Sequence, residues 1–171
     1  ALGKARASCD IELFGAFLGS KGDWAEWRWQ KALLGLGWTR DAEAAPALFE
    51  HLGTSYPQRI RATAALALGR LGKHHDGLGV PVREALCEDL GSKGMREQLG
   101  RISGLVALGD TAAIPVLQRL RKSASDGRVM RVAYEACVRL GEQASGSDAL
   151  ASDLERLRAE LEKVNARIER L

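Results

Sequence analysis

The residue types that usually carry catalysis are few in this sequence, and their spacing matches no catalytic or metal-binding motif. The three histidines are His51, His74 and His75, and none stands in a His-Glu-x-x-His or comparable metal-ligand pattern. His74-His75-Asp76 could hold a metal weakly, but it lies beside glycines in an expected turn, where solvated side chains are commoner. There is no glycine-rich phosphate loop and no combination of serine, histidine and aspartate typical of a catalytic triad. We therefore predict no catalytic residue, no cofactor and no metal in this chain, and no enzymatic activity of its own.

The three cysteines also give no sign of a reactive or structural site. Cys9, Cys87 and Cys137 are odd in number, lie far apart and have apolar surroundings. This pattern is typical of small buried side chains in a reducing compartment, so we expect a cytoplasmic protein. Glu88 and Asp89 follow Cys87, and their charges would raise the pKa of the thiol instead of activating it.

Basic residues recur at similar positions in four similar segments of the chain. If these segments form stacked helix hairpins, one groove should contain Arg28, Lys31, Arg59, Arg70, Arg96, Arg128 and Arg139. Arginine makes bidentate hydrogen bonds to carboxylates and phosphates, so the groove could bind an acidic segment, a chain carboxylate or a nucleic acid. Alternatively, each arginine pairs with an acid of the neighbouring hairpin, such as Asp41, Glu88 or Asp126, and needs no ligand.

All four tryptophans lie between Trp24 and Trp38. Trp24 and Trp27 are three residues apart and should share one face of a helix. Exposed aromatic side chains are common anchors of interfaces, so these two are candidates for contact with a partner. Core packing at the end of the molecule is the alternative.

The elements that position these residues are indicated by a repeat. The glycines Gly37, Gly72, Gly109 and Gly141 are 35, 37 and 32 residues apart, and each follows a leucine. Apolar residues one, four and five positions before the glycine form one face of a helix, and the glycine itself suits a left-handed helix end. The sequence therefore predicts four similar helices.

A shorter helix precedes these helices. Asp41 and Pro46, like Asp110 and Pro115, are five residues apart, which predicts an aspartate cap followed by proline in the first turn. A third copy is predicted to begin at Pro81, and residues 9–18 are a candidate first copy. No alternating pattern typical of strands is present.

From residue 148 onward, apolar residues recur at alternating steps of four and three, the 3.5-residue period of a coiled coil. They are Leu150, Leu154, Leu157, Leu161, Val164, Ile168 and Leu171. In a parallel homodimer Asp153 would face the partner's Arg158, a contact worth roughly a few tenths of a kcal/mol. The alternatives are a helix that folds back on the last hairpin and a helix that meets a different protein.

Length and composition agree with one globular domain. Of the 171 residues, 46% are apolar and 27% are charged, which excludes an intrinsically disordered chain. A net charge of +3 is weak evidence for a polyanionic partner. No apolar run approaches the ~20 residues of a membrane span, so no membrane association is expected. The chain begins with Ala1 and not with methionine, which suggests a piece of a larger protein.

These patterns predict an all-α protein: an α-solenoid of about four helix hairpins at residues 1–142, a linker at 143–147 and a heptad helix at 148–171. The Asp-x4-Pro-x-Leu entries and the second helices that end in Leu-Gly resemble the HEAT-repeat family. This resemblance covers roughly residues 23–142. It implies a stack of hairpins and is compatible with several functions.

The order of repeats, linker and heptad tail is also similar to the C-terminal region of bacterial zinc aminopeptidases of the gluzincin type. The segments 82–86, 109–120, 126–131 and 153–163 carry this likeness. No position matches the zinc ligands or the catalytic glutamate of that family. The resemblance implies a non-catalytic appendage of a larger bacterial enzyme.

Three functional hypotheses remain. The leading hypothesis is a protein-interaction scaffold, whose partner is another protein or the rest of a larger chain. The second is a nucleic-acid binder that uses the basic residues of the predicted groove. Its affinity for nucleic acid would fall steeply as the salt concentration rises. The third is an enzyme built on the solenoid, for which the predicted groove positions offer only one acid, Glu135.

Overall fold

The computed structural model describes residues 9–18 and 25–168, and in these residues the regular elements are helices, with no strand. The predicted all-α class is therefore confirmed. The α-helices are α1 (Cys9–Leu18), α2 (Ala25–Thr39), α3 (Ala45–Glu50), α4 (Gln58–Gly72), α5 (Asp76–Cys87), α6 (Met95–Leu108), α7 (Ile114–Ser123) and α8 (Gly127–Ile168). Short 3-10 turns precede three of them: η2 (Ala42–Ala44), η3 (Leu90–Ser92) and η4 (Thr111–Ala113).

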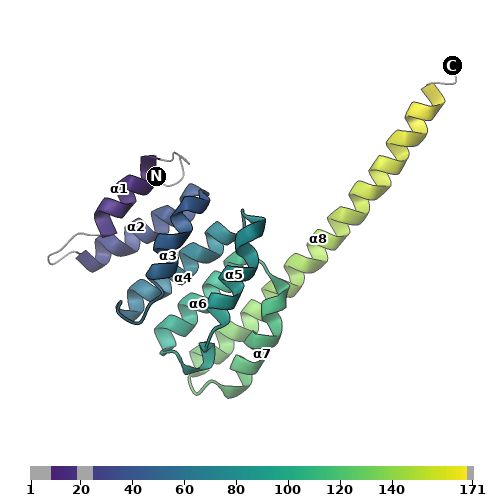
Figure 1. Ribbon diagram of the computed structural model, residues 1–171. Coiled ribbons are helices and arrows are strands. Elements are labelled where there is room, and N and C mark those ends of the chain that lie inside the picture. Colours follow the sequence, from purple (N-terminus) through teal and green to yellow (C-terminus); the bar gives the residue numbers. More distant parts are fainter. Residues whose placement is uncertain (1–8, 19–24, 169–171) are drawn as a thin grey trace.

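The even-numbered helices pack side by side in chain order, with α2 against α4, α4 against α6, and α6 against the first part of α8. The odd-numbered helices lie on them: α1 contacts α2, α3 contacts α4, α5 contacts α4 and α6, and α7 contacts α8. Figure 1 shows these hairpins one after another, and the C-terminal half of α8 projecting away from them. The 42 residues of α8 make a helix about 63 Å long at 1.5 Å per residue.

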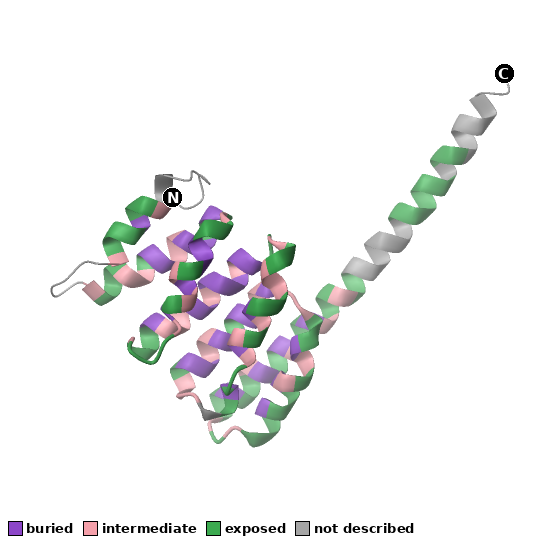
Figure 2. Ribbon diagram, in the orientation of Figure 1, coloured by how far each residue is buried: buried purple, intermediate pink, exposed green. Residues whose placement is uncertain are grey.

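The hydrophobic core lies between the packed helices, and the leucines of the repeat are part of it (Figure 2). Leu36, Leu71, Leu108 and Leu140, each directly before a repeated glycine, are all buried. The leucines four positions before the first three of these glycines are buried completely. The 3.6-residue apolar periodicity therefore marks the face that each helix buries.

Helices α4 and α6 come close together because small residues face each other along their contact. A Cβ atom built on Gly69 would collide with the backbone carbonyl of Gly104, and one built on Gly104 would collide with the carbonyl of Ala65. Gly100 faces Ala62 in the same way. The distance between two packed helices depends on the side chains at the contact, and these residues allow the backbones themselves to touch.

The prediction that each repeated glycine ends its helix in the left-handed conformation is correct for Gly109 alone, which has a φ of 80°. Gly37 lies inside α2, where a Cβ atom would collide with Ala67 of α4, so its role is close packing. Gly141 lies inside α8. The left-handed position after α2 is taken by Arg40, with a φ of 58°.

The predicted starts of the shorter helices are correct in two of three cases. The Asp41 and Asp110 carboxylates accept hydrogen bonds from the backbone of Glu43 and Ala112, at 3.0 Å and 2.9 Å. The third start is wrong, because α5 begins at Asp76 and contains Pro81 in its interior. Asp76 and Pro81 have the same five-residue spacing as the other pairs, but Asp76 is the first residue of α5 and the helix has no side-chain cap.

The linker predicted at residues 143–147 is also wrong, because α8 continues through these residues without a break. Packing against α6 and α7 forms the first turns of α8, and each further residue then adds a backbone hydrogen bond without a new nucleation step. The hydroxyl of Ser145 donates a hydrogen bond to the carbonyl of Gly141 at 3.0 Å, so this polar side chain has a partner within the helix.

Candidate binding groove

Three adjoining pockets form one groove on the face made by α2, α4, α6 and α8. Their volumes are about 320 Å³ at the N-terminal ends of α4 and α6, about 250 Å³ in the middle, and about 350 Å³ beside α8. Ala62 and Thr63 line the first two pockets, and Leu66 and Ser103 line the second and third. These shared residues make the three pockets one continuous surface, which we call the groove.

The floor of the groove is low because of the close contact between α4 and α6. Much of its middle part is lined by residues with small side chains, namely Ala62, Thr63, Gly100 and Ser103. The hydroxyls of Thr63 and Ser103 donate to carbonyls of their own helices at 2.9 Å and 2.8 Å. Their oxygen lone pairs therefore remain available as hydrogen-bond acceptors.

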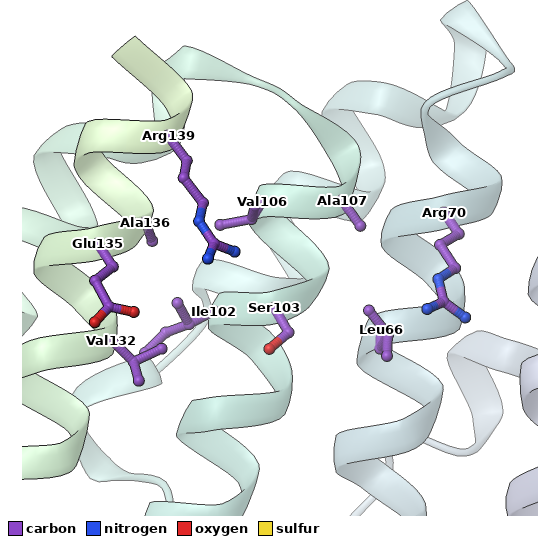
Figure 3. Close-up of a pocket in the computed structure, with 10 residues that line it drawn as sticks. All are labelled: Leu66, Arg70, Ile102, Ser103, Val106, Ala107, Val132, Glu135, Ala136 and Arg139. Atoms are coloured by element: carbon purple, nitrogen blue, oxygen red, sulfur yellow. The ribbon is translucent and has the colours of Figure 1, made fainter. Parts of the chain in front are cut away.

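Four of the seven predicted basic residues line the groove. Arg59 and Arg96 stand at its first end, and Arg70 and Arg139 stand at the end beside α8. Figure 3 shows Arg70 on α4 and Arg139 on α8, on either side of the segment of α6 that carries Ser103. Arginines from three different helices therefore share one surface.

The other three predicted basic residues, Arg28, Lys31 and Arg128, are exposed and lie outside these pockets. The ammonium group of Lys31 lies 5.7 Å from the centre of the Trp27 ring. This is a cation–π contact between two residues of α2.

Arg128 is paired, but its partner is Asp126, two residues earlier in the chain and 2.9 Å away, and not an acid of a neighbouring hairpin as the alternative predicted. Within the described part of the chain, Arg59, Arg96 and Arg139 form no ion pair. The one acidic residue that lines the pockets is Glu135, and it is loosely paired with Arg131 at 3.8 Å. The end with Arg59 and Arg96 therefore has no acid in its lining, and the end with Arg70 and Arg139 has one.

Arg70 is held in place by an aromatic ring. Its guanidinium carbon lies 4.7 Å from the centre of the Trp38 ring, and the Trp38 side chain is itself exposed. Stacking on a ring leaves the hydrogen-bonding edge of a guanidinium group free. Arg70 is therefore oriented before any ligand arrives.

The Arg128–Asp126 pair gives a prediction about titration. Hydrogen bonds from Arg128 lower the pKa of Asp126 from 3.8 to about 2. The pair therefore stabilises the folded state above pH 3.8, and this stabilisation is lost as the pH falls through about 2. Replacement of Arg128 by alanine should raise the pKa of Asp126 towards 3.8, as read by NMR titration, whereas Arg131→Ala should leave it unchanged. A pKa that stays near 2 in Arg128→Ala would contradict this account.

A buried charged cluster was not predicted from the sequence. Glu97 is almost completely buried and contacts Arg61 of α4 at 2.7 Å and Arg101 of its own helix at 3.0 Å. The available signal was the position of Arg101, which is four and seven residues before the core leucines Leu105 and Leu108. A charged residue on a core-facing position needs a buried partner.

The tryptophans divide between the core and the surface. Trp24 lies outside the described residues, and Trp27 is 56% exposed, which leaves the predicted interface role of Trp27 open. Trp29 instead packs edge-on against His51 and Tyr56, with ring centres 6.3 Å and 6.0 Å apart. Core packing therefore applies to Trp29 and not to Trp27.

The heptad residues fall on the projecting part of α8. Leu154, Leu157 and Leu161 are 56%, 55% and 62% exposed, and we call these three the leucine stripe. Because α8 is one continuous helix, the tail does not fold back on the preceding hairpin (Figure 1). The side chains of Leu150, Val164 and Ile168, and all of Leu171, lie outside what the structure describes.

Comparison with known proteins assigns no family: no family model, no curated protein and no solved structure matches this chain. The function is therefore inferred from the groove and the leucine stripe themselves.

The thiols of Cys87 and Cys137 are partly buried. Burial raises the pKa of the Cys87 and Cys137 thiols, which lowers their reactivity. The predicted direction for Cys87 is right, but its main cause is burial and not the two acids beside it in the sequence. Within the described residues, histidine, cysteine and acidic side chains form no group that could hold a metal. The same residues include no helix long and apolar enough to cross a membrane.

Proposed function

We propose that this chain is a non-catalytic interaction module, an α-solenoid of HEAT-like hairpins that associates with a second copy of itself through the projecting end of α8. The leucine stripe is the observation that carries this proposal. Its three leucines are each more than half exposed, on a part of the helix that lies clear of the packed hairpins. Exposed leucines repeated on one side of a helix are typical of an interface.

The spacing of the stripe favours a second helix as the partner. Leu154, Leu157 and Leu161 follow the three-then-four steps of a coiled-coil core, so a facing helix could insert its own leucines between them. Burial of a leucine side chain contributes roughly 1.5–3 kcal/mol. Several leucines from each of two chains would therefore outweigh the cost of association at modest concentration.

The solenoid part of the proposal is supported by the order of helix contacts. Each even-numbered helix packs on the next, and α3, α5 and α7 contact helices of this row. The residues that line the groove all belong to the even-numbered helices. Stacked hairpins commonly use this kind of extended surface for binding.

Substitution of the stripe tests the proposed association. In the full chain, the triple variant Leu154→Gln/Leu157→Gln/Leu161→Gln should sediment as a monomer of 18.5 kDa, whereas the native chain should have twice that mass. Glutamine has good helix propensity, so the helix itself should persist. Sedimentation equilibrium provides the masses.

The matched control places glutamine on the other side of the same turns. Glu155, Ala159 and Glu162 are exposed and lie off the heptad core, so Glu155→Gln/Ala159→Gln/Glu162→Gln should keep the native mass. Equal monomer masses for the native chain and both variants would refute self-association through α8.

Nucleic-acid binding is a second candidate, favoured by the groove arginines that have no acidic partner among the described residues.

The position of this module within a larger zinc-aminopeptidase-like protein stays a prediction from sequence resemblance.

A further inference from the structure

The two ends of the groove are basic, and the part between them is not. Arg59 and Arg96 lie in the first turns of two adjacent helices and face the same pocket. Beyond them come Ala62, Leu66 and Gly100, before Arg70 begins the second basic region. A ligand that follows the groove must therefore carry negative charge at two separated points and small or apolar groups between them.

The distance between the basic regions follows from helix geometry. Arg59 and Arg70 are eleven residues apart on α4, which is about 16 Å along the helix axis at 1.5 Å per residue. An extended polypeptide covers about 3.3 Å per residue. Two acidic side chains about five residues apart would therefore reach both ends.

We propose that the groove binds an extended acidic peptide segment of a partner protein, with one carboxylate held by Arg59 and Arg96 and a second, about five residues away, held by Arg70 and Arg139. The proposal rests on the proposed function as an interaction module and names the chemistry of its partner. Clusters of arginine are a recurrent means of recognising acidic motifs in peptides. The stacking of Arg70 on Trp38 orients one of these arginines in advance.

The polar groups of the groove favour a peptide over a nucleic acid. Thr63 and Ser103 donate their hydroxyl hydrogens to their own helices, so they can offer only acceptors to a ligand. Backbone N–H groups of a peptide can donate to them, whereas the sugar–phosphate backbone of DNA has no donor. The lining residues between the two basic regions are uncharged, which suits a peptide with separated acidic side chains better than phosphates that follow one another at each nucleotide.

A displayed library of random peptides, selected against the full-length chain, tests this proposal. The selected peptides should contain two aspartates or glutamates about five positions apart, with small or apolar residues between them. Fluorescence anisotropy with the strongest labelled peptide then provides dissociation constants. The variant Arg59→Gln/Arg96→Gln should bind roughly tenfold more weakly or worse, since hydrogen bonds between charged groups are lost.

Arg128→Gln is the matched control, because Arg128 is also an exposed arginine in the first turn of an even-numbered helix but lies outside the groove. Its affinity for the peptide should equal that of the native chain. Replacement of the second acid of the peptide by glutamine should weaken binding to the native chain and have little effect on Arg70→Gln/Arg139→Gln. Circular dichroism should show native helix content in every variant, since all five arginines are at the surface.

Three results would overturn the proposal: selection of no peptide, selection of peptides without acidic residues, or unchanged affinity in Arg59→Gln/Arg96→Gln. A labelled single-stranded oligothymidine, measured in parallel, tests whether the groove binds a nucleic acid instead of a peptide. If it binds through the same arginines and no peptide does, the groove is a nucleic-acid site. The masses of the leucine-stripe variants are measured separately, so failure of the groove proposal leaves self-association standing.

Discussion

Replacement of Glu97 by glutamine is expected to lower the free energy of unfolding by about 3–5 kcal/mol. Glutamine has nearly the shape of glutamate, so the change removes the charge and little volume. Arg61 and Arg101 would then remain at a site where their side chains are only 15% and 4% exposed, without the carboxylate that neutralises them. An unpaired buried charge is among the most destabilising features a single substitution can create.

The geometry around Glu97 explains why the effect should be large. One carboxylate oxygen accepts from the Arg61 Nε at 2.8 Å, and the other accepts from the Arg101 Nε at 3.0 Å. Arg61 also donates to the carbonyl of Tyr56 and Arg101 to the carbonyl of Ala85, each at 2.6 Å. The cluster therefore connects α4 and α6 to the turn before α4 and to the end of α5.

Urea unfolding followed by circular dichroism measures this loss. A chain of this size should also show a melting temperature lower by roughly 6–20 °C. Glu84 is exposed on α5, so Glu84→Gln should change stability by no more than about 0.5 kcal/mol. A loss below about 1 kcal/mol in Glu97→Gln would mean that the two arginines find other partners or water.

Replacement of Gly69 by alanine is expected to destabilise the protein by about 1–3 kcal/mol or more. In an isolated helix the same change would stabilise, because alanine has a higher helix propensity than glycine by about 1 kcal/mol. Here the new methyl group would collide with the backbone of Gly104. Since backbone atoms cannot rotate away as a side chain can, α4 and α6 would have to move apart.

Gly141 provides the matched control, with an expected effect of opposite sign. It also lies inside a helix, but a Cβ atom built on it has no neighbour within 4 Å. Gly141→Ala should therefore raise stability by up to about 1 kcal/mol. Denaturant unfolding of both variants under identical conditions reads the difference. Stabilisation of both would show that the contact of α4 with α6 is looser than described.

The groove depends on the same small residues. If α4 and α6 were separated by larger side chains at Gly69 or Gly104, the floor between Arg59 and Arg70 would rise or widen. Stability and binding are therefore linked through one helix contact. For this reason the arginine substitutions, which leave that contact untouched, are the cleaner test of the groove.

Much of the fold could be predicted because amphipathic periodicity is a local property of the sequence. The spacing of Leu36, Leu71, Leu108 and Leu140 indicated four helices and the face that each buries, and all four leucines lie in the core. The same register placed Arg59, Arg96, Arg70 and Arg139 on one surface, where they line the groove. The groove's ligand and the partner of the leucine stripe stay proposals.

Local pattern was a poorer guide to where helices begin and end. The serines and glycines at residues 143–147 predicted a linker, yet α8 passes through them because its first turns are already held by α6 and α7. Pro81 predicted a helix start, yet α5 begins at Asp76. In both cases a packed helix extends beyond the point that residue preferences alone would set.

The sequence by itself determined the helical class and the buried leucines, because both depend on spacing within one helix. Only the tertiary structure decided that Glu97 contacts Arg61 and that Gly69 touches Gly104. These contacts join residues about 35 positions apart, and their register is set by how two helix surfaces fit together. That fit depends on many side chains at once, so the pattern along either helix does not contain it.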